Sequence, residues 1–252
     1  MKLDLNLMDK AACVTGAASG IGRSISDAFL ACGSRVLSVD LKYSEDGKGG
    51  ALSVQNMKEY TLGADLRHSE DARMALEECE RLFGRLDVLV NCAGIEMPGT
   101  VVELSEEAYD KVMDTNVKSM FLTCKHAIPL ILRSTKSGSI INVASDLGLQ
   151  PIPSVDAYAA SKGAIIALTK AMSKNWAKEG LRVNCIAPGP VDTPLLKRFQ
   201  DEKVLDFVKQ YMIPAGRLGR PEEIANVACF LASDLSSFVN GAVLTANGGL
   251  LG

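Results

Sequence analysis

The segment 11–22, AACVTGAASGIG, decides the fold. Its first four residues form an apolar run typical of a buried parallel strand, and a glycine-rich turn follows at once. The apolar spacing of Ile21, Ile25 and Phe29 then predicts a helix that ends near Gly33. Such a turn lets the backbone approach a pyrophosphate, which the helix N-terminus attracts. The segment therefore predicts a dinucleotide-binding unit of strand, turn and helix.

Strand and helix patterns alternate through the rest of the chain. The further predicted strands are 35–39, 86–90, 139–143, 181–186 and 242–245, and 59–62 leads to Asp65. The predicted helices are 69–83 with Ser69 as N-cap, 105–132, 155–178 and one opened by Pro221. This alternation predicts an α/β fold: a Rossmann-like doubly wound parallel sheet with helices on both faces, in a single domain over 1–252. The polar, glycine-rich stretch 42–56 predicts a mobile surface loop.

Composition excludes several classes of protein. The chain has 252 residues and can bury a sizeable core without disulfides or metal. Its net charge of -3, without a basic stripe, argues against nucleic acid as a partner. It shows neither a secretion signal nor an apolar run near the ~20 residues of a membrane span, which excludes a membrane partner. Seven scattered cysteines and two distant histidines predict reduced thiols in a cytoplasm and no protein-ligated metal.

Tyr158 and Lys162 lie four residues apart within the predicted helix 155–178, so they share a face. An ammonium near a phenol favours the phenolate and lowers a pKa that is about 10 in the free side chain. A phenol tuned in this way can take a proton from an alcohol near neutral pH, or return one to a ketone. The alternative is a surface Tyr and Lys on an ordinary helix, because short motifs are weak alone.

Several motifs accompany this pair in a consistent order. They are Thr15-Gly16-x3-Gly20-Ile21-Gly22, Asn91-Cys92-Ala93-Gly94, Asn116, Ser145, Tyr158-x3-Lys162 and Pro188-Gly189. Over essentially its whole length the chain resembles the short-chain dehydrogenase/reductase family. Two positions depart from the family pattern: Cys92, where a second Asn is more frequent, and Asn247, where an Asp is commoner. The second departure puts a local contact in doubt, not the fold.

The resemblance implies catalytic roles for four residues. Tyr158 would be the acid/base, and Lys162 would lower its pKa and hold the nicotinamide ribose. Ser145 would bond the substrate oxygen and stabilise developing charge. Asn116 lies in a predicted helix, which an amide that competes for backbone hydrogen bonds can open locally. In the family the corresponding Asn holds a water that links Lys162 to solvent; the alternative is an ordinary helix-surface Asn.

Asp40 predicts NAD as the cofactor. It ends the second strand, where a carboxylate can accept hydrogen bonds from ribose hydroxyls and would repel a 2′-phosphate. Relatives that use NADP commonly carry Arg or Lys at the positions of Ser19 or Leu41, although Lys42 is close by. The alternative for Asp40 is a solvated strand-end carboxylate. Together with the glycine-rich turn and Asp40, the resemblance implies these cofactor-binding residues: Gly16, Ser19, Gly20, Ile21, Gly22, Asp40, Leu41, Asp65, Leu66, Asn91, Ala93, Gly94, Tyr158, Lys162, Pro188, Gly189, Val191 and Thr193.

The resemblance places the substrate after the fourth to sixth strands. The candidate contacts are Glu96, Asp146, Gln150, Pro190 and Leu195. Glu96 and Asp146 could bond a second hydroxyl of a polyol or cyclic diol, unless both face solvent. We expect NAD-dependent interconversion of a secondary, cyclic or polyhydroxylated alcohol and its ketone. The alternatives are a 3-oxoacyl-[acyl-carrier-protein] reductase, which usually prefers NADP, and a non-catalytic cofactor-binding regulator or scaffold.

Three predicted elements bear on the oligomeric state: the helices 105–132 and 155–178 and the apolar C-terminal strand. In the second helix Ile165 continues the stripe of Tyr158, whereas Ile166 and Trp176 fall elsewhere. Helices apolar on more than one side need a partner besides their own sheet. Because related enzymes pair these helices and pack the last strand against another subunit, the resemblance implies a D₂ homotetramer. The alternative is that these side chains all lie in the monomer core.

Overall fold

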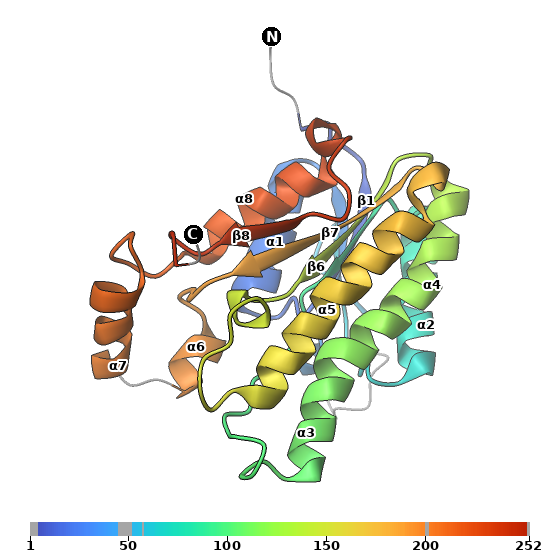
Figure 1. The fold of residues 1–252 in the computed structure, drawn as a ribbon. Coiled ribbons are helices and arrows are strands. Elements are labelled where there is room, and N and C mark those ends of the chain that lie inside the picture. Colours follow the sequence, from blue (N-terminus) through green and yellow to red (C-terminus); the bar gives the residue numbers. More distant parts are fainter. Residues whose placement is uncertain (1–4, 45–51, 57, 200–201, 251–252) are drawn as a thin grey trace.

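The computed structural model describes residues 5–44, 52–56, 58–199 and 202–250. Its sheet has eight strands in the order β3-β4-β2-β1-β5-β6-β7-β8 (Figure 1). All neighbouring strands run parallel except the edge pair β3 and β4. The strands are β1 Ala11–Thr15, β2 Arg35–Val39, β3 Leu52–Val54, β4 Glu59–Leu62, β5 Val88–Asn91, β6 Gly138–Val143, β7 Leu181–Pro188 and β8 Val243–Ala246. The predicted doubly wound α/β fold is confirmed.

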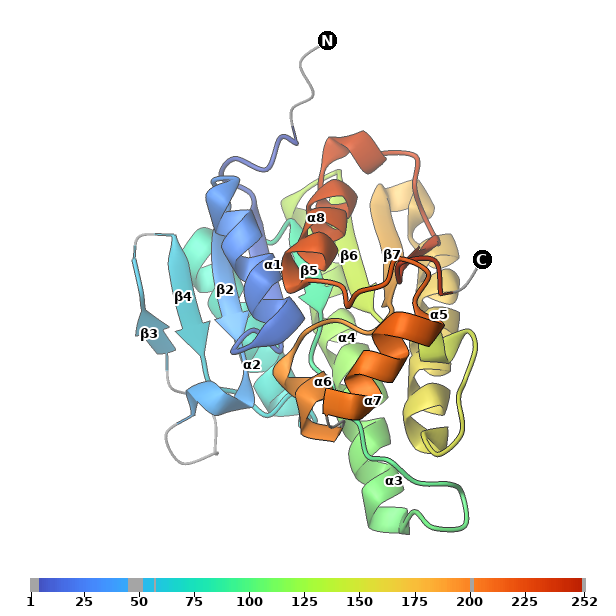
Figure 2. The ribbon, with the colours of Figure 1, turned by 90° about the vertical axis from the view of Figure 1, so that its left-hand side faces the viewer.

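Helices cover both faces of the sheet (Figure 2). Helices α1 and α8 pack against each other on one face, and α2, α4 and α5 lie on the other. The helices are α1 Gly20–Ala31, α2 Ser69–Phe83, α3 Glu106–Met113, α4 Ser119–Ser134, α5 Asp156–Asn175, α6 Pro194–Phe199, α7 Glu202–Phe207 and α8 Pro221–Ala232. Most predicted elements begin and end within a few residues of these bounds.

Two hydrophobic cores explain why the central strands read as continuous apolar runs. Cys13 and Leu89 point to the core under α2 and α4, whereas Val14 and Val90 point to the core under α1 and α8. Successive residues of a strand face opposite sides, so a sheet covered on both faces needs apolar residues at every position. This packing places the carboxyl ends of β1, β2, β5, β6 and β7 at one edge of the molecule.

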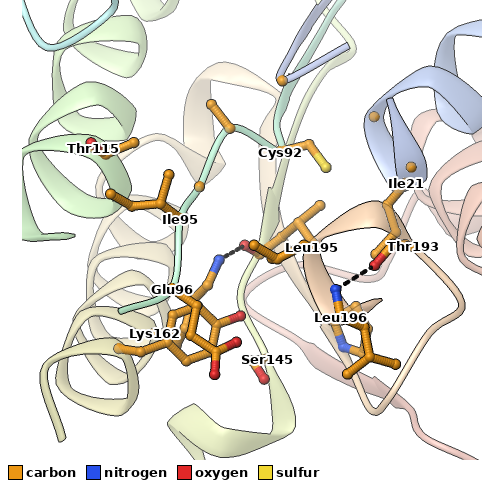
Figure 3. Close-up of a pocket in the computed structure, with 18 of the residues that line it drawn as sticks. Ile21, Cys92, Ile95, Glu96, Thr115, Ser145, Lys162, Thr193, Leu195 and Leu196 are labelled. Carbon is orange, nitrogen blue, oxygen red and sulfur yellow. Dashed lines mark hydrogen bonds between the residues drawn. The ribbon is translucent and has the colours of Figure 1, made fainter. Parts of the chain in front are cut away.

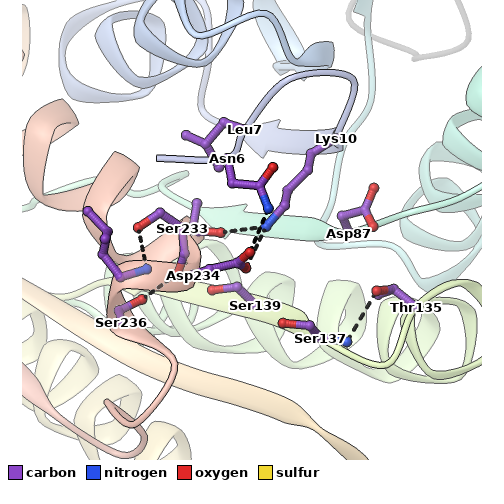
Figure 4. Close-up of polar contacts among 12 residues, drawn as sticks. Asn6, Leu7, Lys10, Asp87, Thr135, Ser137, Ser139, Ser233, Asp234 and Ser236 are labelled. Carbon is purple, nitrogen blue, oxygen red and sulfur yellow. Dashed lines mark hydrogen bonds and ion pairs between the residues drawn. The ribbon is translucent and has the colours of Figure 1, made fainter. Parts of the chain in front are cut away.

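The opposite edge of the sheet is closed by polar contacts (Figure 4). Asp234, just beyond α8, accepts hydrogen bonds from Asn6 Nδ2 at 2.7 Å and from Lys10 Nζ at 3.2 Å. Arg182 at the start of β7 donates to Ser236 Oγ at 2.7 Å. These contacts tie the beginning of the described chain to the end of α8, and they leave the carboxyl edge as the open end.

Three features differ from the sequence prediction. Leu52–Val54 pairs antiparallel with β4, so the prediction of a loop there was wrong; the part of that prediction at 45–51 lies outside the described residues. A strand of three residues is too short to show alternation. The N-cap of α2 is His68 rather than Ser69, without a side-chain cap bond. Helices α6 and α7 were also not predicted from the sequence.

Among the described residues, no helix is long and apolar enough to span a membrane.

Candidate active site

A cavity of about 960 Å³ opens at the carboxyl ends of the parallel strands. This is the edge at which open α/β sheets bind ligands. The predicted residues that line it are Gly16, Ser19, Gly20, Ile21, Gly22, Asp40, Leu41, Asp65, Leu66, Ala93, Gly94, Glu96, Ser145, Asp146, Tyr158, Lys162, Pro188, Gly189, Pro190, Val191, Thr193 and Leu195. Asn91, Asn116 and Gln150 do not line it. The fold therefore gathers residues from across the chain into one site.

The glycine-rich turn between β1 and α1 lies flat against the end of β5. Thr15 Oγ1 accepts hydrogen bonds from the backbone N–H groups of Cys92 at 3.1 Å and Ala93 at 3.2 Å. A Cβ on Gly16 would lie 2.7 Å from the Ala93 backbone, and one on Gly22 would lie 2.2 Å from the Gly16 carbonyl oxygen. Only glycine fits at these two positions. The backbone is thus bare where a pyrophosphate would approach the N-terminus of α1.

Asp40, at the end of β2, is held by the backbone. Its Oδ2 accepts from the Ala18 N–H at 3.0 Å and its Oδ1 from the Lys42 N–H at 2.9 Å. Within the described residues no cationic side chain pairs with it. A fixed, uncompensated carboxylate at the cavity rim suits the two hydroxyls of a ribose and disfavours a phosphate. Turn and carboxylate together fit a dinucleotide.

Arg67 lines the same end of the cavity, and the sequence reasoning missed it. Its guanidinium lies 2.6 Å from Asp65 Oδ2. Hydrogen bonding to Arg67 lowers the pKa of Asp65. Arg67 is therefore committed to an ion pair. The sequence signal that could have revealed Arg67 is its positive charge two residues after Asp65, the carboxylate that follows β4.

Tyr158 and Lys162 lie on α5 and line the cavity together with Ser145; Figure 3 shows Lys162 and Ser145 in it. Lys162 Nζ donates to the Val143 carbonyl oxygen at 3.0 Å and lies 5.5 Å from the centroid of the Tyr158 ring. Ser145 follows β6 and caps a 3-10 turn over Asp146–Gly148 by accepting the Leu147 N–H. A strand end and a buried helix face thus fix a hydroxyl, a phenol and an ammonium in one place.

Burial dominates the ionisation of this group. It raises the pKa of Tyr158 well above its usual range, and the charge of Glu96 adds to the rise, while a hydrogen bond with Ser145 opposes it. Burial also lowers the pKa of Lys162. The net effect on the Tyr158 pKa is therefore opposite to the lowering expected from Lys162: burial is the largest cause and raises the pKa, because the side chain lies in the interior. Burial thus favours the neutral phenol, the form that donates a proton to a ketone.

Asn116 lies where the helix between α3 and α4 departs from regular α geometry. A π-helical turn over Asp114–Lys118 interrupts the regular hydrogen bonding there, which confirms the predicted local opening. The Asn116 Oδ1 accepts the Ile95 N–H at 2.8 Å, and its Nδ2 donates to the Ile95 carbonyl at 2.9 Å and to Ser161 Oγ at 2.9 Å. The alternative of a surface Asn is excluded. Its side chain anchors the backbone that follows β5.

Two predicted contacts lie outside the cavity. Asn91 Nδ2 donates to Asn142 Oδ1 at 2.8 Å, and Asn91 Oδ1 accepts from Thr123 Oγ1 at 2.6 Å. This side chain belongs to a buried polar network beneath the site, because β5 and β6 place both amides on the same face of the sheet. Gln150 is exposed just beyond the 3-10 turn that follows Ser145. Sequence position alone did not reveal either orientation.

Glu96 and Asp146 both line the cavity rather than facing away from it. Burial raises the pKa of Glu96, and it raises the pKa of Asp146 to about 6. The surrounding lining is mainly apolar and includes Ile152 and Met212. Among the described residues no cluster of His, Cys, Asp and Glu could hold a metal ion. The reactive end thus presents carboxyl groups among apolar side chains.

Known proteins share both the sequence and the architecture. A family model described as enoyl-(acyl carrier protein) reductase matches residues 16–251. An NAD-dependent glycerol dehydrogenase of Listeria innocua is 36% identical over 98% of this chain and 95% of its own length. A 3-oxoacyl-[acyl-carrier-protein] reductase of Chlamydia trachomatis is 36% identical over 97% of this chain and 98% of its own. The ligand-free aldohexose dehydrogenase of Thermoplasma acidophilum superposes with a TM-score of 0.87, at 31% identity, over 98% of this chain and 96% of its own.

Proposed function

The chain belongs to the short-chain dehydrogenase/reductase family of oxidoreductases, and we propose that it is an NAD-dependent enzyme that interconverts a secondary alcohol and its ketone. One observation carries the proposal. Ser145, Tyr158 and Lys162 lie together in the cavity that begins at the glycine-rich turn and at Asp40. The intact set argues against a non-catalytic regulator or scaffold.

The roles of the residues follow from their placement. The bound nicotinamide would supply or accept the hydride, which is the chemistry that the protein lacks. Tyr158 gives its proton to the oxygen of a ketone, or takes one from an alcohol. Ser145 holds that oxygen within reach of Tyr158 and stabilises its charge. Lys162, fixed by Val143, would bind the ribose beside the phenol.

We propose a hydroxyl-rich substrate, such as a polyol, a cyclic diol or a sugar. Glu96 lines the reactive end and can accept a hydrogen bond from a second hydroxyl. Asp146 adjoins it, but its Oδ1 accepts the Ser145 hydroxyl and its Oδ2 is buried. Relatives named as glycerol and aldohexose dehydrogenases support this class. A second candidate is reduction of a 3-oxoacyl thioester, because relatives of equal identity carry that name and the cavity wall is mainly apolar.

An activity screen tests the proposal. Polyols, cyclic diols, aldohexoses and 3-hydroxyacyl thioesters would each be offered with NAD and with NADP, and reduced nicotinamide would be followed by its absorbance. We expect the highest kcat/KM with NAD and a hydroxyl-rich alcohol. The highest value with NADP and the thioester would support the second candidate instead. If no substrate gives reduced cofactor, the result would instead support a non-catalytic cofactor-binding regulator or scaffold.

The cofactor assignment predicts the effect of Asp40→Ala. The parent should prefer NAD to NADP, because the carboxylate held by the Ala18 and Lys42 N–H groups repels the extra phosphate. The substitution should weaken NAD binding and narrow the preference, measured as the ratio of kcat/KM for the two cofactors. Asp110→Ala, an exposed carboxyl on α3, should leave the ratio unchanged. Equal kcat/KM values for NAD and NADP in the parent would contradict the assignment of NAD as the preferred cofactor.

We propose a homotetramer, and light scattering at micromolar concentration should give about four times 26.8 kDa. Ile165 and Ile166 are buried within the subunit, which agrees with the alternative that the apolar side chains of this helix lie in the monomer core. Tyr109 on α3 and Phe121 on α4 remain about half exposed, and Phe238 near β8 is fully exposed. These exposed apolar side chains support two subunit contacts: a pairing of the helices, and a contact near the last strand. A clean monomer mass would defeat the proposal, and a dimer would leave only the helix pairing.

A further inference from the structure

Asp146 is a buried carboxyl directly beside Ser145. Its side chain is 3% exposed, and its Oδ1 accepts the Ser145 hydroxyl at 3.1 Å. Its Oδ2 is buried and has no hydrogen-bond partner among the described residues. An unpartnered carboxylate oxygen in the interior is costly, and such a group calls for an explanation. The role already given to Ser145 does not supply one.

Asn247, whose amide is a second unpartnered group, lies beside Gly189, as Asp146 does. Asn247 Oδ1 accepts the Gly249 N–H at 3.2 Å, which leaves Nδ2 as a buried donor without a partner. A Cβ on Gly189 would lie 2.7 Å from Asn247 Cβ and 3.2 Å from Asp146 Oδ2. The Cβ of a neutral residue therefore lies close to the buried carboxyl. An Asp at this position would set a like charge against Asp146 and disfavour its ionised form.

The other ionisable groups around Asp146 come from two elements. Tyr158 and Lys162 face the site from α5, and Glu96 follows β5. The charges of Glu96 and Asp146 both raise the pKa of Tyr158, so both carboxyls act on the reactive phenol. Burial raises the pKa of Asp146 to about 6, against the bonds from Ser145 and the Leu147 N–H. Charged and neutral Asp146 are thus both accessible within the physiological pH range.

The hydroxyl of Ser145 has a single proton to donate. When Asp146 is charged, that proton forms a charge-assisted hydrogen bond to Oδ1, which is stronger than a bond to a neutral acceptor. In ketone reduction the same proton must bind the substrate oxygen as negative charge develops on it. The carboxylate and the substrate therefore compete for one donor. A neutral Asp146 is the weaker competitor and frees the hydroxyl for the substrate.

We propose that Asp146 is a positioning residue that sets the direction in which Ser145 donates its hydrogen bond, and that it thereby makes ketone reduction depend on pH. Asn247 is the neutral neighbour that allows Asp146 to ionise within the working range. The inference rests on the proposed function, since it concerns the same reaction. In the wild-type enzyme kcat/KM for reduction should fall by about three- to tenfold as pH rises through the ionisation of Asp146.

The test is the pH profile of kcat/KM for ketone reduction with NADH over about pH 5 to 8, which brackets the Asp146 pKa of about 6. Asp146→Asn should abolish the step and keep the higher, low-pH value throughout. Asn247→Asp should keep the step and move its midpoint to higher pH. Asp9→Asn makes the same change as Asp146→Asn on an exposed carboxyl at the opposite edge, and it should retain the wild-type profile.

Glu96→Gln distinguishes the effects of the two cavity carboxyls on the pH profile. If ionisation of Asp146 causes the fall in kcat/KM, the fall should persist in Glu96→Gln. Equal profiles for wild type and Asp146→Asn, or an unmoved midpoint in Asn247→Asp, would overturn the inference. If Asp146→Asn does not fold, the midpoint in Asn247→Asp decides alone. A wild-type enzyme that reduces ketones without any such step rejects only the role of Asp146. Failure to reduce any ketone rejects the proposed function, and this inference with it.

Discussion

Tyr158→Phe should lower kcat by at least about a hundredfold, the lower range for general acid/base catalysis. The phenol is the only proton carrier that we assign, and its ring is 8% exposed between α5 and the cavity. Phenylalanine keeps the ring volume and removes the hydroxyl that hydrogen-bonds to Ser145. NADH binding should therefore change little. Steady-state ketone reduction and a fluorescence titration with NADH measure the two quantities separately.

Tyr60→Phe is the matched control for this prediction. Tyr60 lies on β4 and packs edge-on against Phe83 with ring centroids 5.6 Å apart, away from the cavity lining. The same loss of a phenolic oxygen there should leave kcat unchanged. If Tyr158→Phe retains turnover within a few-fold of the parent, Tyr158 is not the acid/base.

Asn116→Ala should lower the free energy of unfolding by about 2–6 kcal/mol, from two part-buried backbone groups left unpaired at roughly 1–3 kcal/mol each. The side chain is 1% exposed and satisfies both the N–H and the C=O of Ile95. Alanine leaves both groups without this partner, and the Ser161 hydroxyl keeps only its bond to the Tyr158 carbonyl oxygen. Equilibrium unfolding in urea would measure the change as a shift in midpoint at constant slope.

Asn175→Ala, at the exposed end of α5, is the control and should change stability by well under 1 kcal/mol. The comparison also bears on catalysis. Gly94 brings the backbone close to Asn116 Oδ1 and Lys162 Nζ, so a displaced Ile95 segment should also raise the KM for the cofactor. An Asn116→Ala variant as stable as the parent would show that Asn116 does not hold this segment.

The sequence predicted the parts of the fold that local pattern determines. The apolar run 11–14 and its glycines define β1, the turn and the start of α1, because a two-sided core demands apolar residues at every position. The spacing of Tyr158 and Lys162 placed both on one face of α5. The short edge strand β3 and the helices α6 and α7 escaped prediction because they are too short for a periodic signal.

The orientation and ionisation of individual side chains depend on tertiary packing and could not be predicted. Asn91 bonds Asn142 because strands distant in the sequence lie side by side. The raised pKa of Tyr158 reflects how completely α5 buries it, which a four-residue spacing cannot reveal. Gly189 lies close both to Asp146 and to Asn247, which is about a hundred positions further along the chain. The departure at Asn247 was visible in the sequence, but this proximity was not.

The central claim is that the enzyme moves a hydride between a carbinol carbon and NAD while Tyr158 carries the proton. The most direct measurement offers NAD and a polyol, a cyclic diol or a 3-hydroxyacyl thioester deuterated at the reacting carbon. The account predicts one deuterium in the reduced nicotinamide for each ketone formed, at a rate at least about a hundredfold lower in Tyr158→Phe. Reduced cofactor without deuterium, or equal rates in the two proteins, would contradict it.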